Sequence, residues 1–244
     1  MLYANYYPIA LIKIFIATEN GHEKAEKALE YSILSSSSEE VSITWMKDQF
    51  GETFSGWNKS RNNSLVNSGI GWKTNFSCYR WAIPELCEFS GKAIYLDVDQ
   101  IVLKDIAQMW NLEMSDKAVL SIRPEKTDVM LIDCSKFAGD WWPRISEMKP
   151  SGKSQKHYRC MVQNRGLIGD LDGIYNCLDG KGLSENTRLL HYTNMNTQPW
   201  HPSPESMVYK PHKHHFLDVL WWGFYYKALE YESATKRTLG NIAK

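Results

Sequence analysis

The stretch AIYLDVDQIVLKDIAQMW, which spans Ala93 to Trp110, decides the fold expected for this chain. Its first four residues are apolar and predict a buried strand that ends at two acidic residues, Asp97 and Asp99. Alternate residues of a strand point to the same face, so the two carboxylates are expected on one face, about 6.6–6.8 Å apart. In open α/β sheets ligands bind at the carboxyl ends of the strands, which places both aspartates at the expected ligand site.

The two aspartates have the chemistry of a divalent cation site. Carboxylates held this close repel each other unless a cation lies between them. Their oxygens suit Mg²⁺ or Mn²⁺, and the remaining coordination positions would go to diphosphate oxygens and water. The alternative is structural, with Asp97 capping a turn and Asp99 solvated, which is the commoner outcome for an arbitrary Asp-x-Asp tripeptide.

The residues that precede this stretch predict a β-α-β unit. Ile9–Ala17 is rich in β-branched and apolar residues, His22–Leu34 carries apolar residues at helical spacing, and Val41–Met46 alternates as a second strand. This order of elements is typical of a parallel sheet. Phe50–Gly71 is rich in Gly, Asn and Ser without periodicity, and we interpret it as a loop with a functional role.

The rest of the chain predicts short elements around one polar surface segment. Helices are expected at Asn75–Phe89 (interrupted near Pro84), Asp105–Trp110 and Phe216–Tyr231, strands at Ala118–Ile122, Val129–Asp133 and Leu189–Tyr192, and the surface segment at Lys149–Arg165. Together these patterns predict one α/β domain over residues 1–244, with a mostly parallel central sheet flanked by helices.

The composition of the chain excludes several classes of protein. Its 244 residues include 28 Lys and Arg against 28 Asp and Glu, so it lacks the basic excess that a nucleic-acid-binding protein normally carries. Hydrophobic residues at 43% and charged residues at 23% are ordinary for a globular protein, which excludes a disordered chain, collagen and a coiled coil.

The cysteines and the apolar runs favour a cytoplasmic protein. Five cysteines without a Cys-x-x-Cys spacing do not make a zinc knuckle or a disulfide framework, and we interpret them as reduced thiols. No apolar run reaches the roughly 18 residues that span a bilayer. The short run Leu11–Ala17 contains a lysine and lacks the basic leader of a signal peptide.

Three segments of the chain resemble the family-eight retaining glycosyltransferases that use nucleotide-sugars, of the glycogenin and lipopolysaccharide-galactosyltransferase kind. Tyr95–Ile106 resembles the segment that holds the family's Asp-x-Asp motif, and Phe76–Leu86 resembles the helix before it. His191–Trp200 resembles the family's terminal His-x-x-Gly-x-x-Lys-Pro-Trp motif. Because the order and approximate spacing match over about residues 9–200, the resemblance implies the GT-A fold.

The resemblance implies an enzyme that transfers a hexose from a nucleotide-sugar, expected to be a UDP-sugar, with retention of anomeric configuration. The acceptor is expected to be a saccharide or a glycolipid. A Mn²⁺ or Mg²⁺ ion bound by Asp97, Asp99 and His191 would neutralise charge on the leaving nucleoside diphosphate. For His191 taken alone, a hydrogen-bonded core histidine is the commoner interpretation.

The same resemblance assigns residues to the donor site. Arg80 corresponds to an arginine on the helix before the motif and would contact the phosphates or the sugar, with an ion pair to Glu85 as the alternative. The further donor-site residues are those of the turn after the first strand, which would bind the uracil-ribose half, and the residue between the two aspartates: Ala17, Thr18, Glu19 and Val98.

The terminal motif departs from the family pattern at two positions that are still assigned to the donor site. Asn194 stands in place of the glycine, and Gln198 stands in place of the lysine that meets the diphosphate. Gln198 keeps a hydrogen-bonding group and loses the charge, which Lys210 or Lys213 would have to supply instead.

The region that would face the donor sugar also departs from the family. Lys126–Asp128 stands where the family has Asn-Ala-Gly, and the Asp-Gln of many members is not plainly present. Asp170 and Asp172 are the nearest acidic residues and are our candidates for a catalytic carboxylate. Because no residue is an obvious nucleophile, we favour a front-face route in which the departing diphosphate takes the acceptor's proton.

The C-terminal part of the chain is rich in aromatic residues. Three interpretations are open: a helix that packs on the sheet, a membrane-surface patch, and stacking of acceptor sugars on Trp200, Trp221 or Trp222. With the resemblance, residues 9–135 are expected to form the nucleotide-binding half, and 136–244 the acceptor-side half with the terminal helix. Peripheral contact with the inner face of the membrane and a homodimer are both left open.

Two other functions stand as alternatives. Leu96–Asp99 also fits the nucleophile strand of haloacid-dehalogenase-type phosphatases, although that strand lies near the start of their chains. The second alternative is a GT-A domain that binds a nucleotide-sugar without transferring it, because Gln198 lacks the charge of the family's lysine.

Overall fold

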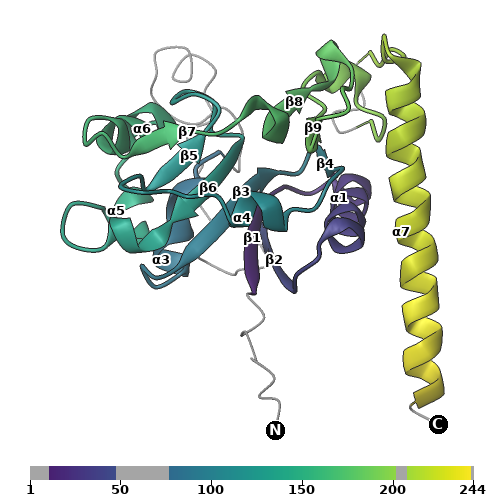
Figure 1. Ribbon diagram of the computed structural model, residues 1–244, viewed down its shortest axis with the longest axis horizontal. Coiled ribbons are helices and arrows are strands. Elements are labelled where there is room, and N and C mark those ends of the chain that lie inside the picture. The colour runs from purple at the N-terminus through teal and green to yellow at the C-terminus, as the bar shows by residue number, and fades with distance from the viewer. Residues whose placement is uncertain (1–10, 48–76, 202–207, 243–244) are drawn as a thin grey trace, which may run out of the picture.

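The computed structural model describes residues 11–47, 77–201 and 208–242, and a six-stranded sheet forms its centre (Figure 1). The strand order is β2-β1-β3-β6-β5-β7. Only β6 runs antiparallel to its neighbours, so the prediction of a mostly parallel α/β sheet is confirmed. The strands are β1 (Ile12–Ala17), β2 (Val41–Met46), β3 (Lys92–Asp97), β5 (Val119–Ser121), β6 (Val129–Asp133) and β7 (Ile168–Asp170).

The predicted β-α-β unit opens the described chain. The helix α1 (Glu23–Ser36) connects β1 to β2, and the two strands pair in parallel from Ile12↔Val41 to Ala17↔Met46. Two glutamates lie in the first turn of α1, where negative charge favours the helix dipole. The predicted loop Phe50–Gly71 lies outside the described residues.

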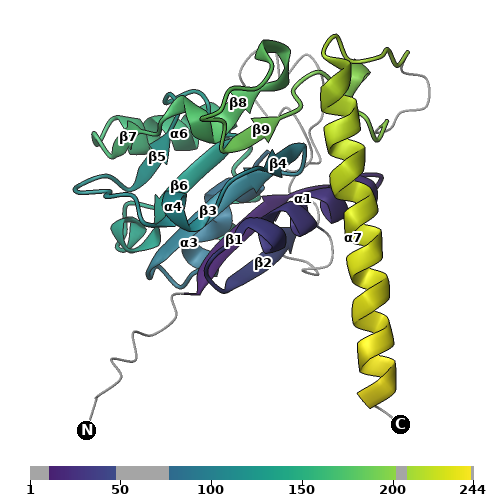
Figure 2. The ribbon, with the colours of Figure 1, turned by 45° about the vertical axis from the view of Figure 1, so that its right-hand side comes forward.

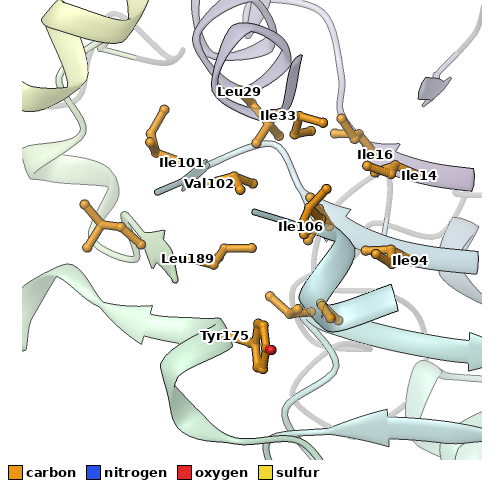
Figure 3. Packing of buried hydrophobic residues seen from close by; sticks show 14 of the residues in the cluster. Ile14, Ile16, Leu29, Ile33, Ile94, Ile101, Val102, Ile106, Tyr175 and Leu189 are labelled. Carbon is orange, nitrogen blue, oxygen red and sulfur yellow. The ribbon is translucent and has the colours of Figure 1, made fainter. Parts of the chain in front are cut away.

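Strand alternation divides the buried residues into two clusters, one on each face of the central sheet. Ile14 and Ile16 face α1, whereas Phe15 and Ala17 between them face the other side. Figure 3 shows the first cluster, in which sheet residues such as Ile94 lie against residues of α1, α4 and the second sheet. Burying one isoleucine side chain contributes about 1.5–3 kcal/mol, so this layer accounts for much of the fold's stability.

A second, three-stranded sheet covers part of the α1 face. Its order is β4-β9-β8, with β4 (Gln100–Val102), β8 (Cys177–Leu178) and β9 (Leu189–His191). The prediction of a single strand that runs to Asp99 is therefore wrong at its C-terminal end, because β3 ends at Asp97. The chain changes partners there: the Val98 N–H bonds to the Ala17 carbonyl at 3.1 Å, and the Tyr192 N–H bonds to the Asp99 carbonyl at 2.9 Å.

The other face of the sheet is covered by short helices. Where a helix was predicted over 75–89, the described part holds a 3₁₀ turn, η2 (Tyr79–Ala82), and a short helix, α3 (Ile83–Leu86). Pro84 lacks an N–H and fits only the first turn of a helix, so a new helix begins beside it.

The remaining short elements are α4 (Ala107–Trp110), η3 (Cys134–Phe137), α5 (Ile145–Met148), η4 (Gly173–Asn176), η5 (Asp179–Lys181) and η6 (Met195–Thr197).

The predicted surface segment contains a helix, α6 (Gln155–Gln163). Tyr158 and Val162 are buried from it, four residues apart, while most of its other side chains are polar. This spacing is amphipathic, but two apolar positions in nine residues are too few to identify a helix from sequence.

The terminal helix α7 (His215–Ile242) stands beside α1 along one side of the molecule (Figures 1 and 2). Leu217, Trp221 and Ala228 are buried against the body of the protein. The helix continues beyond the predicted end at Tyr231 because no proline interrupts the residues that follow. Among the described helices, α7 included, none has the length and apolar character to cross a membrane.

Candidate functional site

The candidate site lies where the chain passes from the central sheet to the small one. Ala17 and Asp97 end their strands and are paired in register. Beyond them, Gln100 of β4 is paired with His191 of β9. These pairings bring the two predicted aspartates and the predicted histidine to one edge of the fold, although they lie far apart in sequence.

Asp97 is held by two side chains on the face opposite α1. Its Oδ1 lies 3.1 Å from Nη2 of Arg80 and accepts a hydrogen bond from the Tyr95 hydroxyl. Burial raises the pKa of Asp97 to about 7; the Arg80 charge opposes this shift, and the charges of Asp128 and Asp99 add to it.

Arg80 is buried at 4% exposure and does not make the ion pair with Glu85 considered from the sequence. Its Nη1 donates to the carbonyl and hydroxyl oxygens of Thr127. Glu85 instead accepts a hydrogen bond from the Ile145 N–H at 2.6 Å. Although burial alone would lower the pKa of Arg80, the Asp97 charge raises it, so the guanidinium stays charged. Arg80 therefore links Asp97 to the residues that precede β6.

Asp99 and His191 form the second half of the site. Nε2 of His191 lies 3.1 Å from Oδ1 of Asp99, and its Nδ1 lies 2.8 Å from Oδ1 of Asn176. Because an amide oxygen only accepts, Nδ1 carries a proton and Nε2 is the nitrogen presented to Asp99. Burial acts to lower the pKa of His191, but the Asp99 charge outweighs it and raises the pKa to about 9.

Gln198 supports Asp99 from the terminal motif. Its Nε2 donates to the Tyr192 carbonyl at 2.7 Å and lies 3.3 Å from Oδ2 of Asp99. The side chain is buried, and its Oε1 has no hydrogen-bond partner among the described residues. Gln198 is thus directed to the protein's own aspartate, whereas the lysine of the family pattern meets the diphosphate.

The turn predicted to bind the nucleoside lies beside this site. Ala17 and Val98 are buried and contribute the backbone hydrogen bond that ends β3. The Thr18 hydroxyl donates to Glu26 of α1 at 2.7 Å, so this side chain is already used within the protein. Glu19 is half-buried at the start of the turn. The Thr18 side chain is therefore not the part of this turn that would bind a ligand.

Three other predicted residues lie on exposed turns. Asp170 ends β7, and Asp172 caps η4 by accepting a hydrogen bond from the Ile174 N–H at 3.0 Å. Asn194 caps η6 in the same way, from the Asn196 N–H at 3.1 Å. Within the part of the chain that the structure describes, no hydrogen bond or ion pair joins these residues to Asp97 or Asp99, and the two caps have an evident structural role.

Some of the donor atoms of this site suit a hard divalent cation, and others are already bound within the protein. Oδ1 of Asp99 is buried, faces Nε2 of His191 and accepts no well-aligned hydrogen bond within the described chain. Asp97, in contrast, is bound by Arg80 and Tyr95. Across residues 11–47, 77–201 and 208–242, no three His, Cys, Asp or Glu side chains are grouped closely enough to hold a metal ion. The structure therefore brings two of the three predicted ligands together.

Two residues of the site were missed from the sequence. Tyr95 had a signal, because it lies two positions before Asp97 on one strand and must share its face. Asn176 had no such signal in the sequence, because it reaches His191 only through the pairing of β8, which follows it, with β9.

The model of glycosyl transferase family 8 matches residues 7–159, which is more than half of the chain. A search of curated proteins found no match.

Solved structures of glycosyltransferases share the fold. The chain aligns with the glycosyltransferase GlyE of Streptococcus pneumoniae TIGR4 at a TM-score of 0.59 and 14% identity, covering 93% of this chain and 64% of that one. It aligns with the galactosyltransferase LgtC, solved with donor and acceptor sugar analogues, at a TM-score of 0.54 and 12% identity, covering 87% and 95%. The bifunctional glycosyltransferase WbbM, in its apo form, gives 0.55 and 11%, covering 78% and 47%. The chain thus spans about two thirds of GlyE and about half of WbbM.

Proposed function

Because the chain belongs to glycosyltransferase family 8, we propose that it is a metal-dependent, retaining hexosyltransferase that uses a UDP-sugar and a saccharide or lipid-linked acceptor. The fold is that of GT-A glycosyltransferases. In this proposal, residues 9–135 form the nucleotide-binding half and residues 136–244 the acceptor-side half. The family match argues against the phosphatase alternative.

The observation that carries the proposal is the contact between Asp99 and His191. Two strands from distant parts of the chain place a carboxylate oxygen and an imidazole nitrogen 3.1 Å apart, with the carboxylate oxygen otherwise unbonded. A buried carboxylate is costly unless a charge or hydrogen bonds compensate it. Asp99 and a His191 that has lost its Nε2 proton would form a ligand pair for a cation, and Asp97 would complete it.

Mn²⁺ or Mg²⁺ held by Asp97, Asp99 and His191 would supply positive charge for the leaving nucleoside diphosphate. Asn176 would keep His191 in the tautomer whose Nε2 faces the cation. Arg80 would hold Asp97 in place and keep its guanidinium next to the donor phosphates. The turn from Ala17 to Glu19 would bind the nucleoside with its backbone groups.

We propose a front-face route for the transfer itself. Asp170 and Asp172 are exposed, and the Asp172 carboxylate caps a turn by accepting a hydrogen bond from the Ile174 N–H. In this route the departing diphosphate accepts the proton of the acceptor hydroxyl as the new glycosidic bond forms, and no protein carboxylate becomes glycosylated. A glycosyl-enzyme trapped on Asp170 or Asp172 would contradict the route.

Calorimetric titration of UDP tests the proposal on the wild type with Mn²⁺, on the wild type with EDTA, and on Asp99→Asn with Mn²⁺. We expect binding only in the first case, because Asp99 and the cation act together on the diphosphate. Asp116→Asn is the matched control, since Asp116 is an exposed aspartate paired with Lys117, and it should bind like the wild type.

The outcomes separate the proposal from its alternatives. UDP binding that survives both EDTA and Asp99→Asn would overturn the assigned metal site. Metal-dependent UDP binding without hydrolysis of any UDP-hexose would favour the alternative of a domain that binds a nucleotide-sugar without transferring it. The contact of Gln198 with Asp99 is the observation that supports this alternative. Slow hydrolysis of one UDP-hexose without acceptor would support the transferase.

A further inference from the structure

A cavity of about 750 Å³ lies between the segment that follows β9 and the exposed face of α7. One wall is the terminal motif at Thr197 to Pro199, and the other is one face of α7 around Trp222. A third wall is formed by the segment around Lys210. The N–H of Lys210 donates to the Asn196 carbonyl at 2.8 Å, which holds this segment against the terminal motif. The volume is in the range of small-molecule sites.

The cavity offers aromatic faces of the kind that bind sugar rings. Trp222 and Tyr226 stack on each other, with ring centroids 5.7 Å apart, and both line the cavity. Tyr209 and His201 line it from the facing segment. Trp200 and Trp221 are buried in the core, which excludes them from the stacking considered from the sequence. Trp222, which is half-buried and has the Lys24 ammonium 5.7 Å from its ring centroid, is therefore the one of these three tryptophans that borders the cavity.

Polar groups accompany these rings, as pyranose hydroxyls require. Asp218 and Lys210 line the cavity with opposite charges, and both types of side chain bond well to hydroxyls. Gln198 lines it too; this residue is 97% buried, and its Oε1 lacks a partner within the described chain.

Gly223 keeps the helix wall of the cavity open. It lies in the interior of α7, where glycine is unfavourable, yet a Cβ added there would meet no atom within 4 Å. Packing therefore does not require glycine at this position, and the missing side chain leaves this part of the helix wall open to the cavity.

Gln198 also connects the cavity to the site described above. Its Nε2 lies 3.3 Å from Oδ2 of Asp99, so the same side chain borders the cavity and the proposed transfer centre. We infer that this cavity binds a pyranose ring of the acceptor saccharide, stacked on Trp222 beside Gly223. The inference rests on the proposed transferase function and adds to it where the acceptor is held.

Ligand-observed NMR titration of four disaccharides, lactose, maltose, cellobiose and N,N′-diacetylchitobiose, tests the inference on the intact chain. We expect at least one to bind the wild type, and Gly223→Leu to weaken that binding about tenfold or more by occupying the open wall. Trp222→Ala should weaken it similarly by removing the stacking face. Ser233→Leu, an exposed change farther along the same helix, is the matched control and should have no effect.

UDP binding with Mn²⁺ is measured in the same variants. If the wild type binds UDP but none of the four disaccharides, or if disaccharide binding persists in Gly223→Leu and Trp222→Ala, the inference is wrong and the proposed function stands. If Gly223→Leu abolishes UDP binding instead, the cavity belongs to the donor and the inference is also wrong. If the wild type fails to bind UDP but a disaccharide depends on Trp222, only the proposed function fails.

Discussion

His191 has its orientation set by a residue that makes no contact with any proposed substrate. Oδ1 of Asn176 accepts a hydrogen bond from the Nδ1–H of His191 and thereby leaves Nε2 facing Asp99. Groups that orient a metal-bound histidine typically change metal affinity when they are removed. The amide oxygen of Asn176 should therefore matter to the cation rather than to stability alone.

We expect Asn176→Ala to weaken Mn²⁺-dependent UDP binding by about 10–100-fold, because the imidazole loses the bond that fixes its tautomer. Calorimetry of UDP at fixed Mn²⁺ measures the change. Asn164→Ala is the control, since Asn164 is an exposed asparagine at the end of α6. Equal binding by both variants would show that His191 needs no orienting partner.

Among the elements, α7 contains a glycine that its own packing does not require. We expect Gly223→Ala to stabilise the protein by about 1 kcal/mol, because alanine favours a helix and its methyl group meets open space. Urea unfolding followed by circular dichroism measures the free energy. Gly152→Ala should act in the opposite direction by about 1–2 kcal/mol, since Gly152 has a positive φ of 61° that alanine tolerates poorly. A loss of stability in Gly223→Ala would mean that the helix does need glycine there.

Elements with a regular apolar period were predictable from the sequence, and those made by tertiary contacts were not. The apolar runs of β1 and β6, the alternation of β2 and the helical spacing of α1 identified these elements. The ends of β2 and β6 agree, those of α1 lie within two residues, and the predicted start of the first strand at Ile9 lies outside the described residues. The end of β3 was placed too late, because the strand stops when Val98 bonds to Ala17 and Asp99 passes to the second sheet. The short strands β7 and β8 have two or three residues each and carry no period to detect.

The resemblance to the glycosyltransferase family named residues for the candidate site, but it did not predict the contacts between them. Asp99 and His191, two of the three expected ligands, lie in contact. The spacing of two residues placed Tyr95 on the face of Asp97, whereas the contact of Arg80 with Asp97 depends on tertiary packing that spacing does not encode. Asn176 depends on β8 pairing with β9, a contact between separate segments that no local pattern encodes.

At the scale of the whole molecule, ligand binding should appear as added stability. A ligand that binds only the folded state at 100 times its Kd stabilises the protein by about 2.7 kcal/mol. We therefore expect UDP and Mn²⁺ together to raise Tm, as followed by tryptophan fluorescence, and UDP with EDTA to leave it unchanged. An equal shift with EDTA would mean that the nucleotide binds without the cation.

The division of the site between two sheets has a consequence for the newborn chain. The ribosome releases the N-terminal part first, so β1, α1, β2, β3 and β6 can fold while β9 is still being synthesised. Asp99 is then outside the exit tunnel without His191, and the proposed cation site is still incomplete. A chain that stops short of β9 would fold much of the sheet and still be unable to capture its donor.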